Sequence, residues 1–175
     1  MKQKIREHYL KIRKKKYFEL NNKNQIFIVK QVKKLSNKYK IDKLAFYYPI
    51  NYELNILPAI VRFQIKKIKI CLPVIEKNNN MSFKEWKSEE PLHVNRIGIL
   101  EPNYKNKRMY PQMILVPLVA YDKYKNRLGY GKGYYDRFFN KFCKKKNILS
   151  VGIAFSFQQT NKIPKEKHDK TLDYI

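Results

Sequence analysis

The stretch Arg127-Leu-Gly-Tyr-Gly-Lys-Gly-Tyr-Tyr-Asp136 decides the fold, because it joins an apolar strand to a helix through a glycine-rich loop. The strand is expected from Met113 to Ala120, a nearly continuous apolar run of the kind that lies buried in a sheet. The helix is expected from about Tyr134 to Lys146. A buried strand, a loop and a helix in this order are typical of α/β proteins, in which helices cover a largely parallel sheet.

The rest of the chain repeats this alternation of strands and helices. Periodicity and breaker residues predict helices at Lys2 to Leu20, Gln25 to Tyr39 and Leu54 to Lys67, and strands at Lys43 to Tyr48, Lys69 to Ile75, Met81 to Trp86 and Ile148 to Phe155. A polar tail is expected from Ser156. The 175 residues have the size of one domain. We therefore expect a single-domain, three-layer α/β sandwich, with a largely parallel or mixed sheet and helices on both faces.

The formal net charge of +25 is the most conspicuous feature of the composition. A field of this sign attracts polyanions such as nucleic acid. The basic residues are dispersed, however, and no helix-turn-helix, zinc-finger or aromatic RNA-binding signature is present. We therefore attribute the charge to a lysine-biased composition and expect no nucleic-acid partner, although small anionic ligands would be attracted.

Other signals indicate a cytoplasmic protein. Apolar stretches such as Met113 to Tyr121 are far shorter than the roughly 20 residues that cross a bilayer, and the amino-terminal residues lack the apolar core of a secretory signal. Cys71 and Cys143 have no second cysteine or histidine at metal-ligand spacing, which fits a reducing compartment and argues against a zinc site. We expect no membrane partner and a monomeric protein.

The glycine-rich loop has the composition of a phosphate-binding site. Gly129, Gly131 and Gly133 are three of the five glycines in the chain. Alternating glycines let successive backbone amides point at one anion, and the start of the following helix also favours phosphate. Arg127 and Lys132 add cationic donors, and Asp136 in the first helical turn is placed to hold Mg²⁺. The alternative is an ordinary glycine turn capped by an acidic residue.

The first helix carries cations that could face the same ligand. At about 100° per residue, Lys2, Arg6 and Arg13 fall within about 40° of one another, beside an apolar stripe. They could therefore line a cleft. A solvated basic face is the alternative.

Two segments carry a resemblance to a known family. Val116-Pro-Leu-Val-Ala-Tyr-Asp122 and Arg127-Leu-Gly-Tyr-Gly-Lys-Gly-Tyr-Tyr-Asp-Arg137 resemble the signature of the 5-formyltetrahydrofolate cyclo-ligase family. Lys2-Gln-Lys-Ile-Arg6 resembles the family's amino-terminal Lys-x-x-Leu-Arg, whose cations help bind ATP and substrate. Tyr48-Pro49 and Glu53 resemble its Tyr-x-Pro…Glu segment, where the glutamate contacts the folate.

Further similarities extend over nearly the whole chain. They are Met81-Ser-Phe83, Gly98…Glu101-Pro102, Gly152-Ile-Ala-Phe155 with Gln158, and His168-Asp169 before Leu172-Asp173. One departure is Lys125-Asn126, where the family usually has a glycine-containing turn, so the turn type here stays open.

The resemblance implies a reaction with ATP and Mg²⁺ as cofactors and a reduced folate as substrate. ATP would phosphorylate the formyl oxygen of 5-formyltetrahydrofolate, and the neighbouring nitrogen would then expel phosphate, giving 5,10-methenyltetrahydrofolate. Arg127 and Lys132 would be catalytic, and Asp136 and Asp169 would hold the metal. The nucleotide would contact Lys2, Lys4, Arg6, Arg127, Leu128, Gly129, Tyr130, Gly131, Lys132, Gly133, Tyr134 and Tyr135. The folate would contact Arg6, Tyr48, Glu53, Met81, Trp86, Tyr130, Gly131, Lys132, Gly133 and Tyr134.

Two other classes of function remain as alternatives. A basic nucleic-acid-binding protein would explain the charge but not the glycine loop. An ATP-dependent ligase or kinase for another small molecule would keep the loop and change the acceptor, and only the segments around Glu53 and Met81 argue against it.

Overall fold

A mixed six-stranded sheet forms the centre of the computed structural model, which describes residues 1–58, 68–142 and 147–175. The strand order is β10-β7-β1-β2-β3-β6. The first four of these strands are parallel, whereas β3 is antiparallel to both neighbours. The strands span Leu149–Ile153 (β10), Met113–Pro117 (β7), Lys43–Ala45 (β1), Lys69–Ile75 (β2), Met81–Glu85 (β3) and Arg108–Met109 (β6).

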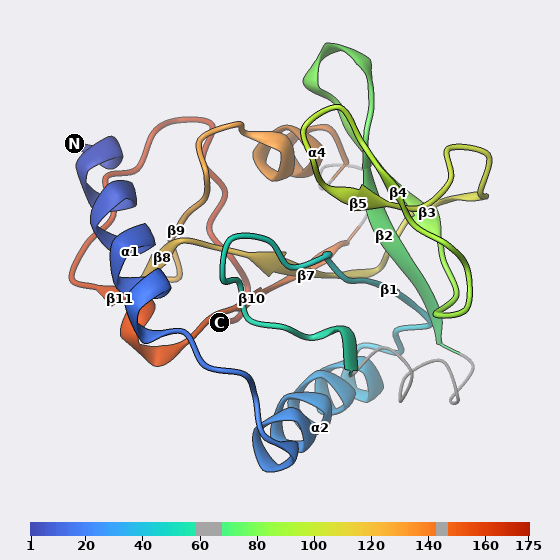
Figure 1. Cartoon of the computed structure of the whole chain (residues 1–175), viewed down its shortest axis with the longest axis horizontal. Helices are drawn as coiled ribbons and strands as arrows, with labels where there is room; N and C mark the ends of the chain where they lie inside the picture. Colours follow the sequence, from blue (N-terminus) through green and yellow to red (C-terminus); the bar gives the residue numbers. More distant parts are fainter. Residues whose placement is uncertain (59–67, 143–146) are drawn as a thin grey trace.

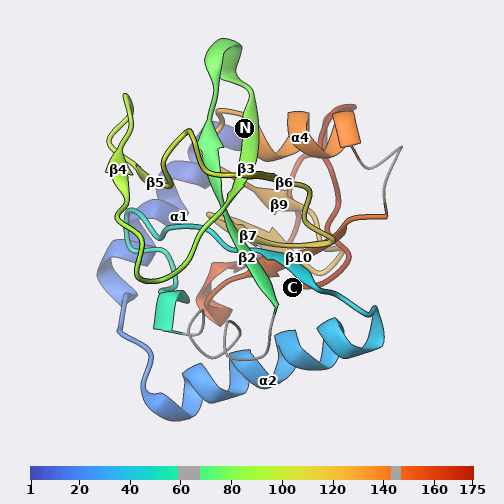
Figure 2. The same ribbon diagram turned by 90° about the vertical axis from the view of Figure 1, so that its right-hand side faces the viewer.

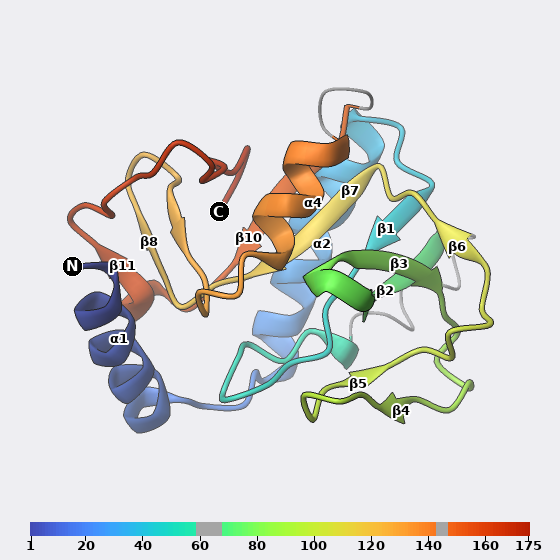
Figure 3. The ribbon, with the colours of Figure 1, turned by 90° about the horizontal axis from the view of Figure 1, so that it is seen from above.

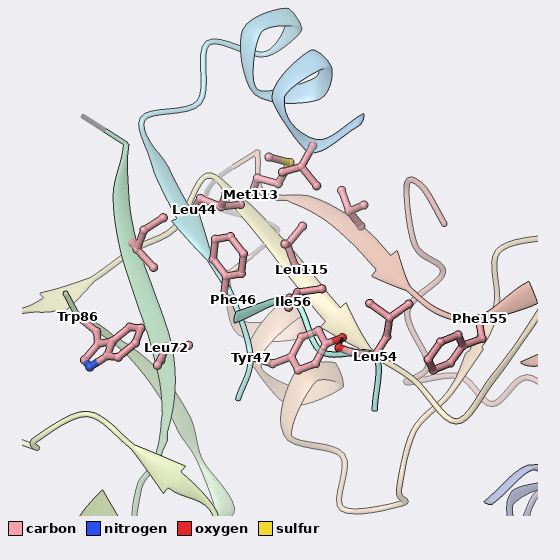
Figure 4. Packing of buried hydrophobic residues seen from close by; sticks show 13 residues of the cluster. Leu44, Phe46, Tyr47, Leu54, Ile56, Leu72, Trp86, Met113, Leu115 and Phe155 are labelled. Atoms are coloured by element: carbon pink, nitrogen blue, oxygen red, sulfur yellow. Dashed lines mark hydrogen bonds between the residues drawn. The ribbon is translucent and has the colours of Figure 1, made fainter. Parts of the chain in front are cut away.

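Helices cover both faces of this sheet, which confirms the predicted three-layer α/β fold. Figures 1 and 2 show α2 (Asn22–Lys38) on one face and α4 (Tyr134–Phe142) on the other. The side chains of β1 alternate accordingly, because successive residues of a strand point to opposite faces. Leu44 packs in the cluster that holds Val32 of α2, and Ala45 packs in the cluster that holds Phe138 of α4. Figure 4 shows part of the first cluster, around Phe46 and Leu115.

A second, three-stranded sheet lies beside the first and was not predicted. It has the order β11-β8-β9, with bounds Gln159–Thr160, Ala120–Asp122 and Arg127–Leu128. The prediction of one strand from Met113 to Ala120 is wrong, because β7 ends at Pro117 and the chain enters β8 after Leu118 and Val119. The side chain of Gln158 donates hydrogen bonds to both intervening carbonyls, at 2.8 and 3.0 Å, and so stabilises the break.

The helix α1 (Lys2–Lys16) packs beside this second sheet, as Figure 3 shows. It ends before the predicted Leu20, because Tyr17 takes an extended conformation and its ring packs 6.0 Å from that of Phe155. No helix within residues 1–58, 68–142 and 147–175 is long and apolar enough to cross a membrane.

Other bounds also differ from the prediction. The strand expected to reach Tyr48 ends at Ala45, and the expected polar tail instead contains η2 (Ser156–Gln158) and β11. The tail then returns to the main sheet, where Tyr174 bridges Val151. A short hairpin of β4 (His93–Val94) and β5 (Leu100–Glu101) and the turn η1 (Lys77–Asn79) complete the described elements. Residues 59–67 and 143–146, which hold most of one predicted helix and the end of another, lie outside the described residues.

Candidate active site

A cavity of about 1030 Å³ opens at the carboxyl ends of three neighbouring strands. Tyr48 after β1, Ile75 at the end of β2 and Pro117 at the end of β7 all line it. This edge is where ligands bind in α/β sheets, because strand ends and the loops after them converge there. The glycine-rich loop after β9 and the start of α1 form the opposite wall.

The glycine-rich loop depends on glycine at two positions. Gly131 and Gly133 have φ of 91° and 67°, a region that residues with a Cβ rarely adopt. A Cβ on Gly131 would also lie only 3.3 Å from the guanidinium of Arg6. Arg6 donates a hydrogen bond from Nε to the carbonyl of Gly129 at 2.8 Å. The helix α1 therefore docks directly onto the loop. Of the three cations expected to line a cleft, Lys2 and Arg6 line the cavity, whereas Arg13 is fully buried behind it.

The two cations of the loop have different environments. The side chain of Arg127 is 5% exposed and forms a salt bridge of 2.8 Å with Asp136. Its Nε is buried and has no hydrogen-bond partner among the described residues. Lys132 is exposed at the tip of the loop and also lines the cavity.

Asp136 and Asp169 lie next to each other on the cavity wall. The backbone N–H of Lys170, adjacent to Asp169, donates a hydrogen bond of 3.2 Å to Asp136. Asp169 belongs to a group with Glu166 and His168 whose possible ligand atoms lie within 4.8 Å of one another. Asp136 is not a member of this group, and the carboxylates of Glu166 and Asp169 supply the oxygen ligands that Mg²⁺ prefers. Each of the two aspartates also has a cationic partner, Arg127 for Asp136 and Lys2 for Asp169.

Glu53 is a buried carboxyl group that lines the same cavity and lies near Tyr130 of the loop. A tight turn holds it, with Asn51 and Tyr52 at φ of 47° and 62° and a 2.9 Å hydrogen bond from the Ile50 N–H to its carboxylate. Burial raises the pKa of Glu53 to about 7, although the Ile50 hydrogen bond, the charge of Arg13 and a hydrogen bond from Tyr130 act in the opposite direction. The group therefore titrates near neutral pH.

Eighteen residues were assigned to the site from their type, their spacing and the family resemblance, and sixteen of them line the cavity. The cavity is lined by Lys2, Arg6, Tyr48, Glu53, Met81, Arg127, Leu128, Gly129, Tyr130, Gly131, Lys132, Gly133, Tyr134, Tyr135, Asp136 and Asp169.

Lys4 and Trp86 are the two that do not line the cavity. Lys4 is exposed, about 200° around α1 from both Lys2 and Arg6. The ring of Trp86 is buried with Leu72 on the α2 face, and its Nε1 donates to the carbonyl of Glu90 at 3.0 Å (Figure 4). We do not retain either residue in the candidate site.

The sequence reasoning missed several lining residues that come from loops without regular spacing. Asn95 and Arg96 lie in the β4–β5 hairpin. Glu101 anchors this hairpin at the site, because its carboxylate accepts hydrogen bonds from Ile75 N–H at 3.0 Å and from the Asn95 side chain at 2.8 Å. The only available signal was the likeness of the Gly98 to Pro102 segment to the family.

Known proteins resemble this chain over most of its length. The sequence pattern of the 5-formyltetrahydrofolate cyclo-ligase family matches residues 1–175. A 5-formyltetrahydrofolate cyclo-ligase of Haemophilus influenzae is 27% identical over 98% of this chain and 94% of its own length. Another from Mycoplasma genitalium is 33% identical over 77% of this chain and 72% of its own length.

Solved structures show the same fold. The 5,10-methenyltetrahydrofolate synthetase of Aquifex aeolicus superposes with a TM-score of 0.76 at 31% identity, covering 98% of this chain and 87% of that one. The synthetase of Mycoplasma pneumoniae gives a TM-score of 0.72 at 23% identity, covering 99% of this chain and 96% of that one.

Proposed function

Because the chain belongs to the 5-formyltetrahydrofolate cyclo-ligase family, we propose that it converts 5-formyltetrahydrofolate and ATP to 5,10-methenyltetrahydrofolate, ADP and phosphate. One observation carries the proposal to this chain: the glycine loop and the Glu53 wall line one cavity. A phosphate donor on the loop and an acceptor on the wall would then meet without leaving the site. Transfer between bound groups is favoured because their entropy has already been lost on binding.

The loop is proposed to bind the nucleotide. Its glycines bring backbone amides close to the phosphates, and Lys2 and Arg6 close over them from α1. Arg127 and Lys132 stabilise the charge on the transferred phosphoryl group, which is the main way in which proteins catalyse this transfer. The buried, unpartnered Nε of Arg127 supports this role, because a buried donor is stabilised by an acceptor.

Asp136 and Asp169 are proposed to hold Mg²⁺, which neutralises phosphate charge when bound. Their cationic partners would then be free to turn toward the phosphates. Both salt bridges connect a proposed metal ligand to a proposed phosphate ligand, Arg127 with Asp136 and Lys2 with Asp169. The two sets of residues therefore act as one unit.

The wall formed by Tyr48, Glu53 and Met81 is proposed to bind the folate. Apolar and aromatic surface suits a flat pteridine, and Glu53 can accept hydrogen bonds from its N–H groups. The formyl oxygen attacks the γ-phosphorus and ADP leaves. The neighbouring folate nitrogen then attacks the formyl carbon and gives up its proton, which leaves with the phosphate as the carbon–oxygen bond breaks. No oxidation or reduction occurs.

The proposal also covers the oligomeric state of the protein and its compartment. We propose that the chain acts as a monomeric, single-domain protein in the cytoplasm. Cys71 is buried and free, which suits a reducing compartment. Size-exclusion chromatography with light scattering tests the monomeric state.

An absorbance assay tests the proposed reaction. Purified protein with 5-formyltetrahydrofolate, ATP and Mg²⁺ should accumulate methenyltetrahydrofolate, and omission of ATP should abolish the signal. If ATP is hydrolysed with another acceptor but no methenyl product forms at any ionic strength, the folate assignment is wrong and the nucleotide assignment stands.

A further inference from the structure

Arg13 is a fully buried cation on α1, at 0% exposure. It forms no salt bridge with any residue in the described part of the chain. Burying a guanidinium is costly unless its donors are paired, so the residues that pair with it indicate why it is there. Nothing in the proposed reaction uses Arg13 directly.

The partners of Arg13 lie more than 100 residues away in the chain. Its Nη1 donates to the carbonyl of Leu118 at 3.2 Å, and its Nη2 donates to the hydroxyl of Tyr130. The guanidinium carbon also lies 5.4 Å from the centre of the Tyr130 ring. Arg13 therefore contacts both the polar tip and the face of this one tyrosine, and its Nε has no partner among the described residues.

Tyr130 occupies a special place in the nucleotide loop. It stands between Gly129 and Gly131, where the backbone is least restricted, so its side chain is the natural anchor for that part of the loop. It lines the cavity together with Glu53, and its hydroxyl is one of the groups that lower the pKa of the Glu53 carboxyl. A chain of contacts thus runs from Arg13 through Tyr130 to the proposed folate wall.

We propose that Arg13 is a positioning residue. It holds the side chain of Tyr130 in place, and Tyr130 in turn fixes the position of the glycine loop relative to Glu53. The inference rests on the proposed function for its kinetic consequence. It needs no contact between Arg13 and either substrate. Arg13 lies outside the lining of the cavity, so its effect on the loop would pass through Tyr130, while its charge also acts on Glu53 directly.

A double-mutant cycle tests this coupling. Tyr130→Phe removes the hydroxyl and keeps the ring, and it should lower kcat/KM by roughly 10- to 100-fold, the usual effect of losing a hydrogen bond to a charged group. Arg13→Met should cause a similar loss. Combined with Tyr130→Phe, however, it should add much less than it does alone, because the two residues act through one contact. Fully additive losses would overturn the proposal.

Hydrogen exchange provides a readout that does not depend on turnover. Amides of residues 127–133 should exchange faster in Arg13→Met and in Tyr130→Phe, whereas Arg13→Lys, which keeps the charge, should restore part of the protection. Lys11→Met, an exposed change on the same helix, controls for the loss of one charge and should leave the loop unchanged.

The outcomes separate the two proposals. Unchanged loop exchange and unchanged KM in variants with a reduced free energy of unfolding would show that Arg13 is merely structural. A wild-type protein that forms no methenyl product would contradict the proposed function, while loop exchange would still decide the role of Arg13. If Arg13→Met does not fold, loop exchange and kcat/KM can still be compared between Tyr130→Phe, Arg13→Lys and the wild type.

Discussion

Lys2 Nζ lies 2.6 Å from Asp169 Oδ2, which joins the first turn of α1 to a segment 167 residues further along the chain. The same ammonium lies 2.9 Å from Glu166. The pair closes one side of the cavity, and both members belong to the proposed nucleotide and metal site. The contribution of this ion pair can therefore be measured in the free energy of unfolding and in the affinity for the nucleotide.

Asp169→Asn should lower the free energy of unfolding by about 1 kcal/mol, as is usual for partly exposed pairs. Burial alone would raise the pKa of Asp169, but the hydrogen bond and charge of Lys2 lower it overall. A depressed carboxyl pKa stabilises the fold above the unfolded value and loses this effect as pH falls through the folded value. The difference in free energy of unfolding between the wild type and the variant should therefore be constant near neutral pH and become smaller below about pH 4.

Urea denaturation at a series of pH values measures this difference. Asp42→Asn is a suitable control, because Asp42 is exposed and its side chain forms no hydrogen bond with the described residues. An equal deficit at pH 3 and pH 7 would show that the pair does not stabilise the protein through its charge.

Lys132→Ala should reduce turnover by orders of magnitude and leave stability nearly unchanged. The side chain is exposed, and the contact of this residue with Arg137 uses its backbone carbonyl, which alanine retains. The assay is methenyl product formation, with thermal unfolding measured alongside. Lys123→Ala, an exposed lysine outside the cavity, should keep the wild-type rate.

Asp136→Asn should also reduce turnover, but it is a less selective change. It removes the carboxylate that pairs with Arg127, whose side chain is 5% exposed. Removing one partner of a buried pair leaves the other charge uncompensated, and we expect a loss of roughly 3 kcal/mol or more. A variant as stable as the wild type would mean that Arg127 finds another acceptor.

Glu53 should make both stability and folate binding depend on pH. Burial is the main cause that raises its pKa to about 7, while Arg13 and Tyr130 act against it. The buried Tyr47 and the partly buried Tyr135 are its other titratable neighbours. The pKa of Glu53 is higher in the folded protein than in the unfolded chain, where it is about 4.5. The stabilising effect of the protonated group is therefore fully present below pH 4.5 and is lost as the pH rises to about 7. The wild type should therefore lose about 3 kcal/mol relative to Glu53→Gln across this range.

Folate affinity should change in the opposite direction, because only the ionised carboxylate accepts hydrogen bonds at both oxygens. Titration calorimetry from pH 5.5 to 8.5 should show tighter binding above about pH 7 for the wild type and a flat profile for Glu53→Gln. A pH-dependent profile in the variant would assign the titration to another group.

Lys125→Gly should be more stable than Lys125→Ala by about 1 kcal/mol. Lys125 has φ of 63° in the turn where the related family usually has glycine. Both substitutions lose the 2.9 Å hydrogen bond from its ammonium to the Asp173 carbonyl, so their difference isolates the backbone. Thermal unfolding of the two variants measures it, and equal stabilities would show that this backbone conformation carries no strain.

The elements that could be predicted are those with long apolar runs. The apolar runs that form β2 and β7 are typical of strands buried in a sheet. Leu44 and Ala45 of β1 pack on opposite faces, which is consistent with a sheet covered on both sides. The loop from Arg127 to Asp136 could be assigned because glycine, cations and a carboxylate rarely occur together without a ligand.

The rest depends on contacts that local sequence does not encode. Strands of two residues, such as β9 and β11, are too short to show a period. Arg13 is charged and would ordinarily be placed on the surface; its burial depends on the distant Leu118 carbonyl and Tyr130 hydroxyl. Trp86 suits a ligand wall by type, and only the packing of the α2 face places it elsewhere.

The place of β1 in the sheet has a consequence for biosynthesis. Its neighbours are β2 and β7, and β7 in turn pairs with β10 near the end of the chain. During translation, β1 therefore cannot pair until β2 and β7 have been synthesised. Such non-local pairing slows folding. The wall at Asp169 is synthesised after the glycine loop, so a nascent chain that already carries the complete loop would still lack one side of the cavity.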